Sequence, residues 1–146
     1  GAELAGQHFF GDTGFGLQAN YTIVRGDVKF DDLNIDDDQF ALLGLSDTAN
    51  LVFMYEKYGV EARVAYNWRD EFLGRTNWGS KNPGYTEAYS QIDANVTYHF
   101  TDNLSVSLEG INITAEDRRE HARNTNMMIG YDDLGARYQI GARYNF

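Results

Sequence analysis

The chain has 146 residues, a length that suits a single domain, and a formal net charge of −10. That charge argues against nucleic-acid binding, because no basic stripe is present to neutralise phosphates. Cysteine is absent, which excludes a disulfide framework and a thiolate metal site. No apolar run approaches the ~18 residues that a membrane helix needs, although membrane strands place apolar residues only at every second position.

Alternation of apolar and polar residues predicts seven strands and no helix. In chain order, the predicted strands are Ala2–Phe10, Phe15–Arg25, Ala49–Glu56, Val60–Trp68, Glu87–Phe100, Leu104–Thr114 and Leu134–Phe146. The apolar parity of the sixth strand changes near Gly110, which indicates a β-bulge or a departure of the chain from the apolar layer.

The connections between these strands alternate strictly in length. Short turns are expected at 11–13, 57–59 and 101–103, and long loops at about 26–48, 70–86 and 115–133. In an antiparallel meander, this alternation places all short turns at one end of the sheet and all long loops at the other. Transmembrane barrels have the same asymmetry, with short periplasmic turns and longer extracellular loops.

The two faces of the predicted strands differ in character. One face carries small and medium apolar residues in mid-strand, with aromatic rings near the strand ends, where a membrane interface favours them. The other face carries charged side chains that suit a wet lumen better than a packed interior. The charged residues expected to face the lumen or a plug are Arg63, Arg69, Glu87, Asp93 and Arg137. The pattern favours an antiparallel transmembrane β-barrel over a soluble β-domain.

Seven is an unusual strand number for a complete barrel, because bacterial single-chain barrels have an even count. We therefore expect the chain to be the C-terminal piece of a larger barrel. A self-contained small barrel of eight strands, with a structural or adhesive role, is the alternative if the acidic region 26–48 contains a further strand.

Three runs of the sequence resemble the C-terminal barrel strands of TonB-dependent outer-membrane receptors. They are GDTGFGLQANYTIV, GLSDTANLVFMYEKYGVEARVAYNWRDEFL and YTEAYSQIDANVTYHFTDNLSVSLEGINIT, and the resemblance extends from Glu3 to Phe146. The end of the chain is similar to the family's β-signal for barrel assembly. The residues at its polar, glycine and two aromatic positions are Gln139, Gly141, Tyr144 and Phe146.

The resemblance implies that residues 1–146 supply about seven meander strands of a barrel of about 22 strands, without the N-terminal plug. It places the protein in the outer membrane of a Gram-negative bacterium. It further implies uptake of a scarce ligand, a metal chelate such as a ferric siderophore or an oligosaccharide. The expected partners are membrane lipid, the plug and remaining strands, the barrel-assembly machinery and, through the plug, the TonB–ExbB–ExbD complex.

The long loops contain the candidate ligand-binding residues. The second loop combines aromatic rings and donors that can stack on a sugar or bind the oxygens of a metal chelate. The third loop has arginines that can reach an anionic ligand, with a salt-bridged rim as the alternative. The candidates are Arg75, Trp78, Tyr85, Arg118, His121 and Arg123. Anchoring at the membrane interface is the alternative role for Tyr85.

Two other chemistries are weaker alternatives. The carboxylates between Asp31 and Asp38 offer oxygen ligands for Ca²⁺, but their spacing is not that of an EF-hand, and a solvated acidic loop is the simpler interpretation. His121 beside acidic residues suggests a barrel-embedded hydrolase, but no serine lies near it in the sequence. We therefore expect no catalytic residue, no metal site and no cofactor.

Overall fold

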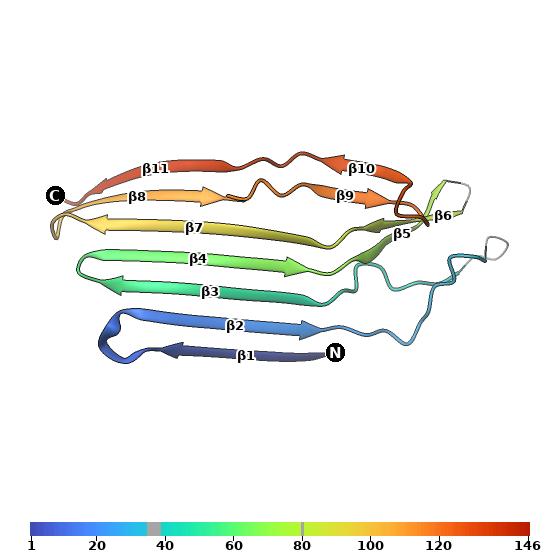
Figure 1. Cartoon of the computed structure of the whole chain (residues 1–146), viewed down its shortest axis with the longest axis horizontal. Helices are drawn as coiled ribbons and strands as arrows, with labels where there is room; N and C mark the ends of the chain where they lie inside the picture. The colour runs from blue at the N-terminus through green and yellow to red at the C-terminus, as the bar shows by residue number, and fades with distance from the viewer. Residues whose placement is uncertain (35–38, 80) are drawn as a thin grey trace.

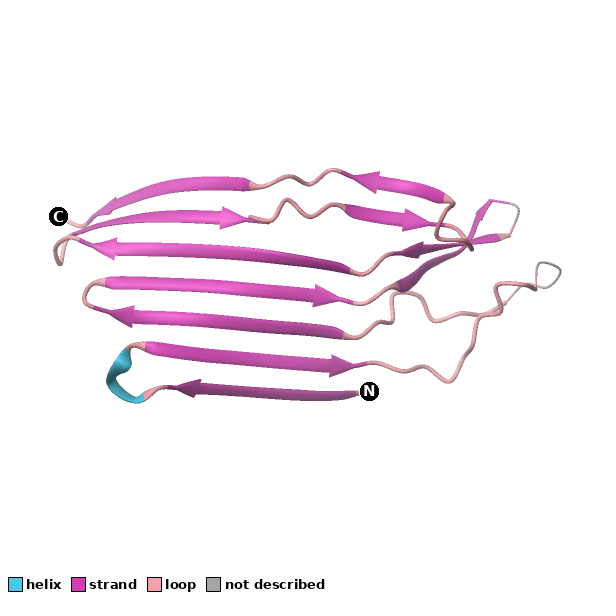
Figure 2. Ribbon diagram, in the orientation of Figure 1, coloured by secondary structure: helices cyan, strands magenta, loops and turns pink. Residues whose placement is uncertain are grey.

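The computed structural model describes residues 1–34, 39–79 and 81–146, and it consists of antiparallel strands in two sheets (Figure 1, Figure 2). The main sheet contains, in spatial order, β1 (Ala2–Phe9), β2 (Phe15–Ile23), β3 (Thr48–Lys57), β4 (Val60–Arg69), β7 (Tyr89–His99), β8 (Leu104–Ile111) and β11 (Arg137–Tyr144). The second sheet contains, in spatial order, β10 (Met128–Asp132), β9 (Arg118–His121), β6 (Asn82–Thr86) and β5 (Phe72–Gly79). The prediction of an all-β, antiparallel fold is confirmed.

All seven predicted strands are present in the main sheet, with ends that shift by up to three residues. The long connections predicted at 70–86 and 115–133 do join strands of the main sheet, but the count of seven strands is wrong, because these segments contain β5, β6, β9 and β10. Their pairing slips between Leu73 and Arg75 and again between Met128 and Gly130. Each slip interrupts the period of two, so alternation along the sequence did not indicate these strands.

The short turns lie together at one end of the main sheet, and the second sheet lies beyond its other end (Figure 1). The turn between β3 and β4 has only two central residues, Tyr58 and Gly59, and both have positive φ, at 55° and 74°. Positive φ at both positions is typical of the type I′ turn, whose twist matches that of the flanking strands. Between β1 and β2, the 3-10 turn η1 (Gly11–Thr13) ends at Gly14, which has a φ of 86°.

One apolar face extends across all seven strands of the main sheet, because each pairing register aligns the apolar parity of neighbouring strands. Phe53 of β3 lies between Leu17 of β2 and Val64 of β4. At the far side of the sheet, Leu108 of β8 pairs with Ile140 of β11. No element within the described residues covers this face: Phe53 is 56% exposed and Ile140 is 76% exposed.

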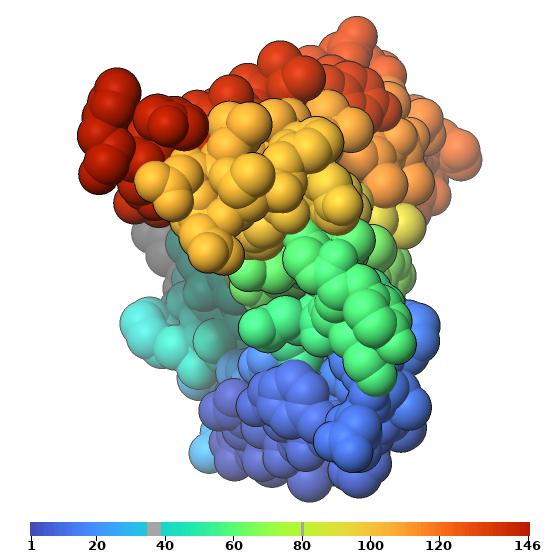
Figure 3. All heavy atoms as spheres, turned by 90° about the vertical axis from the view of Figure 1, so that its left-hand side faces the viewer, coloured from blue at the N-terminus to red at the C-terminus, as the bar shows by residue number. Residues whose placement is uncertain are grey.

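The main sheet is therefore a single layer without an ordinary hydrophobic core. Among the described residues, Val52 and Ala122 are the buried hydrophobic side chains, and Pro83 is the other large side chain that is fully buried. Seen from the short-turn end, the chain runs from the blue N-terminal part through green to the gold and red C-terminal part (Figure 3), as the strand order of a single sheet requires. A soluble β-sandwich would instead bury its apolar face between two sheets.

The change of parity near Gly110 marks the point where the chain leaves the main sheet. Pairing with β7 and β11 continues without a shift through Gly110, so there is no bulge, and β8 ends at Ile111. A Cβ at Gly110 would lie 2.6 Å from Cγ2 of Ile113, so glycine leaves room for the chain that folds back after the strand. The predicted departure from the apolar layer is thus confirmed.

Asn112 holds this departing segment in place. It is buried and has a φ of 53°, a left-handed conformation that asparagine tolerates better than most residues. Its Nδ2 donates to the carbonyls of Glu116 (2.9 Å) and Gly135 (3.1 Å), and its Oδ1 accepts from the Glu116 N–H (3.0 Å). One side chain therefore joins the end of β8 to the segment that precedes β11.

We expect Asn112→Ala to lower the free energy of unfolding by about 2–4 kcal/mol, because it removes three part-buried hydrogen bonds and places alanine at positive φ. Asn112→Gly should cost less, since glycine accepts that φ. The measurement is urea unfolding of the protein in detergent. The control is Asn126→Ala in an exposed turn, and an equal loss in Asn112→Ala and this control would contradict the assignment.

Candidate functional site

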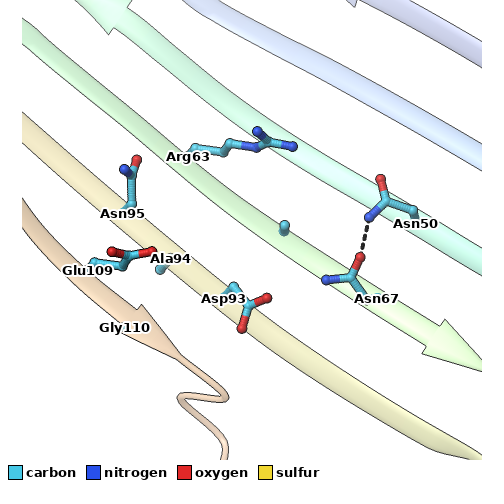
Figure 4. A pocket seen from close by; sticks show the side chains of 9 residues that line it. Asn50, Arg63, Asn67, Asp93, Ala94, Asn95, Glu109 and Gly110 are labelled. Carbon is cyan, nitrogen blue, oxygen red and sulfur yellow. Dashed lines mark hydrogen bonds between the residues drawn. The ribbon is translucent and has the colours of Figure 1, made fainter. Parts of the chain in front are cut away.

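The face opposite the apolar one carries polar side chains and is hollowed over β3, β4, β7 and β8. A hollow of about 300 Å³ lies at this place, and Figure 4 shows the side chains that line it. Its polar lining consists of Asn50, Arg63, Asn67, Asp93, Asn95 and Glu109. Arg63 and Asp93 are two of the residues that the sequence predicted for the charged face, and the structure brings them together in this hollow.

A second hollow of about 400 Å³ continues from the first, and the two share Asn50 and Asn67 in their linings. Thr48, Arg69 and Tyr89, at the ends of β3, β4 and β7 from which the long connections begin, also line it. We call the two hollows together the polar groove. The groove therefore extends from the middle of the polar face to the end of the sheet that bears the long connections.

Side-chain carboxamides form a row across the second hollow, the part of the polar groove that is nearer the long connections. The strand registers place Asn50 between Asn20 of β2 and Asn67 of β4, and Asn67 in turn pairs with Gln91 of β7. Asn50 Nδ2 donates to Asn67 Oδ1. The sequence analysis did not single out these residues, although their positions on the polar parity of four predicted strands could have indicated the row.

A chain of hydrogen bonds fixes one side of the groove. The Tyr89 hydroxyl donates to Gln91 Oε1 (3.0 Å), and Gln91 Nε2 donates to Asp93 Oδ1 (2.6 Å). The same Asp93 oxygen accepts the Asn112 N–H at 2.9 Å. The carboxylate of Asp93 is therefore oriented by its own sheet and by the end of β8.

Arg69 secures the first long connection to the end of β4. Its Nε donates to Ser46 Oγ (2.8 Å), its Nη2 donates to the Gly44 carbonyl, and its guanidinium lies 3.9 Å from the Phe72 ring centroid. Arg137 begins β11 on the polar parity, opposite Ile111. Each of these two arginines lies on the predicted face, but Arg69 is already occupied by contacts within the chain.

Glu87 lies outside the strand predicted for it, because β7 begins at Tyr89. The Glu87 N–H donates to the Arg119 carbonyl at 3.0 Å, so this segment continues the pairing of the second sheet rather than that of the main sheet. Its carboxylate lines a small polar hollow beside Glu116 and Asp117. The prediction that Glu87 begins a main-sheet strand is wrong for this reason.

Asp47, which the sequence did not single out, is a buried carboxylate just before β3. It accepts hydrogen bonds from the Arg25 guanidinium, the Val24 N–H (3.1 Å) and the Tyr21 hydroxyl (3.3 Å). Chiefly because of the Arg25 hydrogen bond, the pKa of Asp47 falls to about 2. Asp47 therefore stays charged at neutral pH and joins both ends of the first long connection.

The three long connections meet at Tyr85 and His121, whose rings stack with centroids 5.5 Å apart. The Tyr85 hydroxyl donates to Asp32 Oδ1 of the first connection (2.5 Å). His121 Nε2 lies 3.0 Å from Glu71 Oε2, and its Nδ1 lies within hydrogen-bonding distance of the Ala122 carbonyl. We call Asp32, Glu71, Tyr85 and His121 the loop cluster. Two of the predicted ligand residues are thus brought together, but in contacts within the chain.

His121 is buried, and its pKa is raised above the ordinary value of 6.5. Burial by itself lowers this pKa, but hydrogen bonds to Glu71 and to the Ala122 carbonyl, with the negative charge of Glu71, more than offset it. Both ring nitrogens are engaged, so neither is available as a general base. This geometry gives no support to the alternative of a barrel-embedded hydrolase.

The other predicted ligand residues lie on the second sheet or beside it. Arg75 Nη2 contacts Glu120 Oε2 (2.5 Å), and Arg118 binds Asp132 Oδ2 through Nε (2.9 Å) and Nη2 (2.6 Å). Trp78 is exposed in β5. Arg123 follows β9, and its Nε is buried without a hydrogen-bond partner within the described part of the chain.

The acidic segment that offered a weaker Ca²⁺ alternative falls partly outside the described residues, because 35–38 are not described. Of its described members, Asp31 accepts the Leu33 N–H at 2.9 Å, and Asp32 accepts the Tyr85 hydroxyl. Within residues 1–34, 39–79 and 81–146, no group of three or more histidine or carboxylate side chains is placed to hold a metal ion.

We expect the loop cluster to loosen as pH rises through the pKa of His121. Because this pKa is raised on folding, protonated His121 stabilises the cluster fully below the unfolded value of about 6.5, and this stabilisation is lost above the folded value. Amide hydrogen exchange of 118–132, corrected for intrinsic rates, measures the effect. In His121→Gln the pH dependence should disappear, whereas His99→Gln at the short-turn end should retain it; an unchanged profile in His121→Gln would contradict this role.

Comparisons with protein-family models, with curated proteins and with solved structures found no match to the chain. Among the described residues, no helix is long and apolar enough to cross a membrane.

Proposed function

We propose that the chain forms part of the wall of an outer-membrane β-barrel, as the C-terminal strands of a TonB-dependent receptor that takes up a scarce ligand. The observation that carries the proposal is a one-layered sheet with an uncovered apolar face and a hollowed polar face. The resemblance of the sequence to such receptors supplies the family and the mode of uptake.

The apolar face is too large to be left in water. Soluble monomers rarely expose contiguous apolar patches above a few hundred Å², whereas here exposed apolar side chains extend from Leu4 of β1 to Ile140 of β11. Contact with lipid tails would remove this surface from water at about 25 cal/mol per Å². The backbone meets the requirement of the hydrocarbon region, because the interior strands are hydrogen-bonded on both sides.

The lengths and ends of the strands suit a bilayer. β3 and β4 have 10 residues each and β7 has 11, within the ~9–11 residues of a tilted strand that crosses a membrane. At the short-turn end, aromatic pairs cluster, with ring centroids 4.7 Å apart for Tyr98 and Phe100 and 5.1 Å apart for Tyr144 and Phe146. Rings of this kind are enriched where a barrel meets the lipid headgroups.

The edge strands favour a larger barrel over a self-contained one. β1 and β11 are the two edges of the main sheet, and both run toward the short-turn end (Figure 1). Direct pairing of these edges would be parallel, so antiparallel closure needs an odd number of further strands. An even total, the rule for bacterial single-chain barrels, meets that condition, because an even number minus seven is odd.

The proposed orientation gives each end of the sheet a role. The short turns would face the periplasm, and the loop cluster and the open end of the polar groove would face the outside. The groove would line the lumen beside the plug, through which TonB–ExbB–ExbD acts. β11 contains Gln139, Gly141 and Tyr144, and Phe146 follows it, so the proposed signal for the barrel-assembly machinery lies on an edge strand that is still unpaired on one side.

Ala94→Arg should lower the free energy of unfolding in lipid by about 2–4 kcal/mol, because Ala94 lies in the apolar face at the middle of β7, where arginine would meet hydrocarbon. Ala65→Arg is the matched control, since Ala65 has the polar parity of β4 beside Asp93 and should cost far less. Urea unfolding in phosphatidylcholine vesicles measures both. Equal costs would refute the assignment of the two faces.

Uptake through a TonB-coupled receptor predicts a shared genetic dependence. Cells that lack this protein and cells that lack TonB should lose accumulation of the same labelled probe, tested with maltohexaose, cellohexaose and a ferric hydroxamate. Loss of both genes should add nothing to either single loss. Accumulation that needs this protein but persists without TonB would contradict the proposed coupling and favour a passive barrel.

A further inference from the structure

We propose that the polar groove is a binding site for a neutral oligosaccharide, which would make a saccharide, rather than an anionic ferric chelate, the ligand that the receptor takes up. This inference rests on the proposed function, because the groove is accessible to an external ligand only if the long connections face the outside. Three features of the groove support it: hydrogen-bonding groups that the chain leaves unused, the absence of excess positive charge, and an aromatic ring in its lining.

The groove offers paired donors and acceptors that the chain itself does not use. The side chains of Asn20 and Asn95 have no hydrogen-bond partner among the described residues, and the Arg63 guanidinium likewise has none there. The bond between Asn50 and Asn67 leaves Asn50 Oδ1 and Asn67 Nδ2 unused. A carboxamide both donates and accepts, which suits the hydroxyl groups of a sugar, since each of these also donates and accepts.

The spacing of these groups suits a ligand with many hydroxyls. Asn20, Asn50 and Asn67 lie on adjacent strands in one row, and neighbouring strands are ~4.8 Å apart. The two hollows, of about 300 and 400 Å³, fall within the range of small-molecule sites. Tyr89 lines the second hollow, and the hydrogen bond of its hydroxyl to Gln91 holds its ring in one orientation. In that orientation the ring can contact the C–H face of a sugar.

The charges of the protein do not favour an anionic chelate. Arg75 and Arg118, which could bind anionic oxygens, are paired with Glu120 and Asp132. Arg69 is held by the first long connection. Within the groove, the one arginine without a partner in the described chain, Arg63, lies in the same hollow as the carboxylates of Asp93 and Glu109. The site therefore lacks the excess positive charge that an anion would require.

Asn20→Leu tests the site without disturbing a hydrogen bond of the fold. We expect this variant to bind neutral hexasaccharides about tenfold more weakly, the change that the loss of one good hydrogen bond produces. Gln18→Leu is the matched control, because Gln18 lies one pleat away on the same strand and face but lines neither hollow. Calorimetry on the protein purified in detergent from outer membranes measures the dissociation constants of maltohexaose, cellohexaose, xylohexaose and an anionic ferric tris-catecholate.

Three results would overturn the proposal. Tight binding of the ferric tris-catecholate with no binding of any hexasaccharide would assign the other ligand class, while leaving TonB-dependent uptake intact. Equal losses in Asn20→Leu and Gln18→Leu would place the saccharide site elsewhere. Binding of neither ligand class, together with equal costs of Ala94→Arg and Ala65→Arg in lipid, would overturn the proposed function as well. Selective weakening of hexasaccharide binding by Asn20→Leu would support the site.

Discussion

The structure depends on one constraint, the register in which seven strands pair. Successive side chains on a strand point to opposite faces, so a slip of one residue in any pair would move every polar side chain of that strand into the apolar face. The observed registers avoid this at each of the six pairings of the main sheet. Both faces follow from it, because the alignment that joins Leu17, Phe53 and Val64 on one side also places Asn20, Asn50 and Asn67 in a row on the other. The apolar surface and the polar groove are therefore two consequences of the same pairing.

Beyond the ends of the main-sheet strands, the chain is stabilised by polar contacts rather than by aligned apolar side chains. The apolar parity stops near Gly110, and the long connections are held by buried polar contacts instead, at Asn112, at Asp47 and in the loop cluster. Such contacts are directional and depend on each partner, since a buried polar group that loses its partner retains its full cost of desolvation. The main sheet depends on an apolar medium or partner to cover one face, whereas the connections are stabilised within the chain. These two parts should therefore respond differently to changes of lipid and of pH.

The main sheet could be predicted from the sequence because its strands are long and their alternation is regular, as in Val60 to Arg69, where every second residue is apolar or aromatic. The strands β9 and β10 could not, since they have four and five residues and their pairing slips at Met128. The charged face was predictable in the same way, and it brought Arg63 and Asp93 into the groove. The loop cluster was not, because Tyr85 meets Asp32 across 53 positions and His121 meets Glu71 across 50. A period of two specifies which face a residue occupies, but it does not specify which distant segment folds over that face.

The polar face combines groups that are fixed with groups that are left open, and this division bears on what it can recognise. Along β7, the chain from Tyr89 through Gln91 to Asp93 is closed by the Asn112 backbone, so these side chains are oriented before any ligand arrives. On β2 and β3, the Asn20 side chain and the Asn50 Oδ1 atom make no hydrogen bond within the described residues. Side chains that are already oriented lose less entropy when a ligand binds. Carboxamides without a partner in the chain can form new hydrogen bonds with that ligand. A neutral polyol benefits from both properties. An anion would need excess positive charge, but Arg69 is bound to the protein itself, and Arg63 lies in the same hollow as the carboxylates of Asp93 and Glu109.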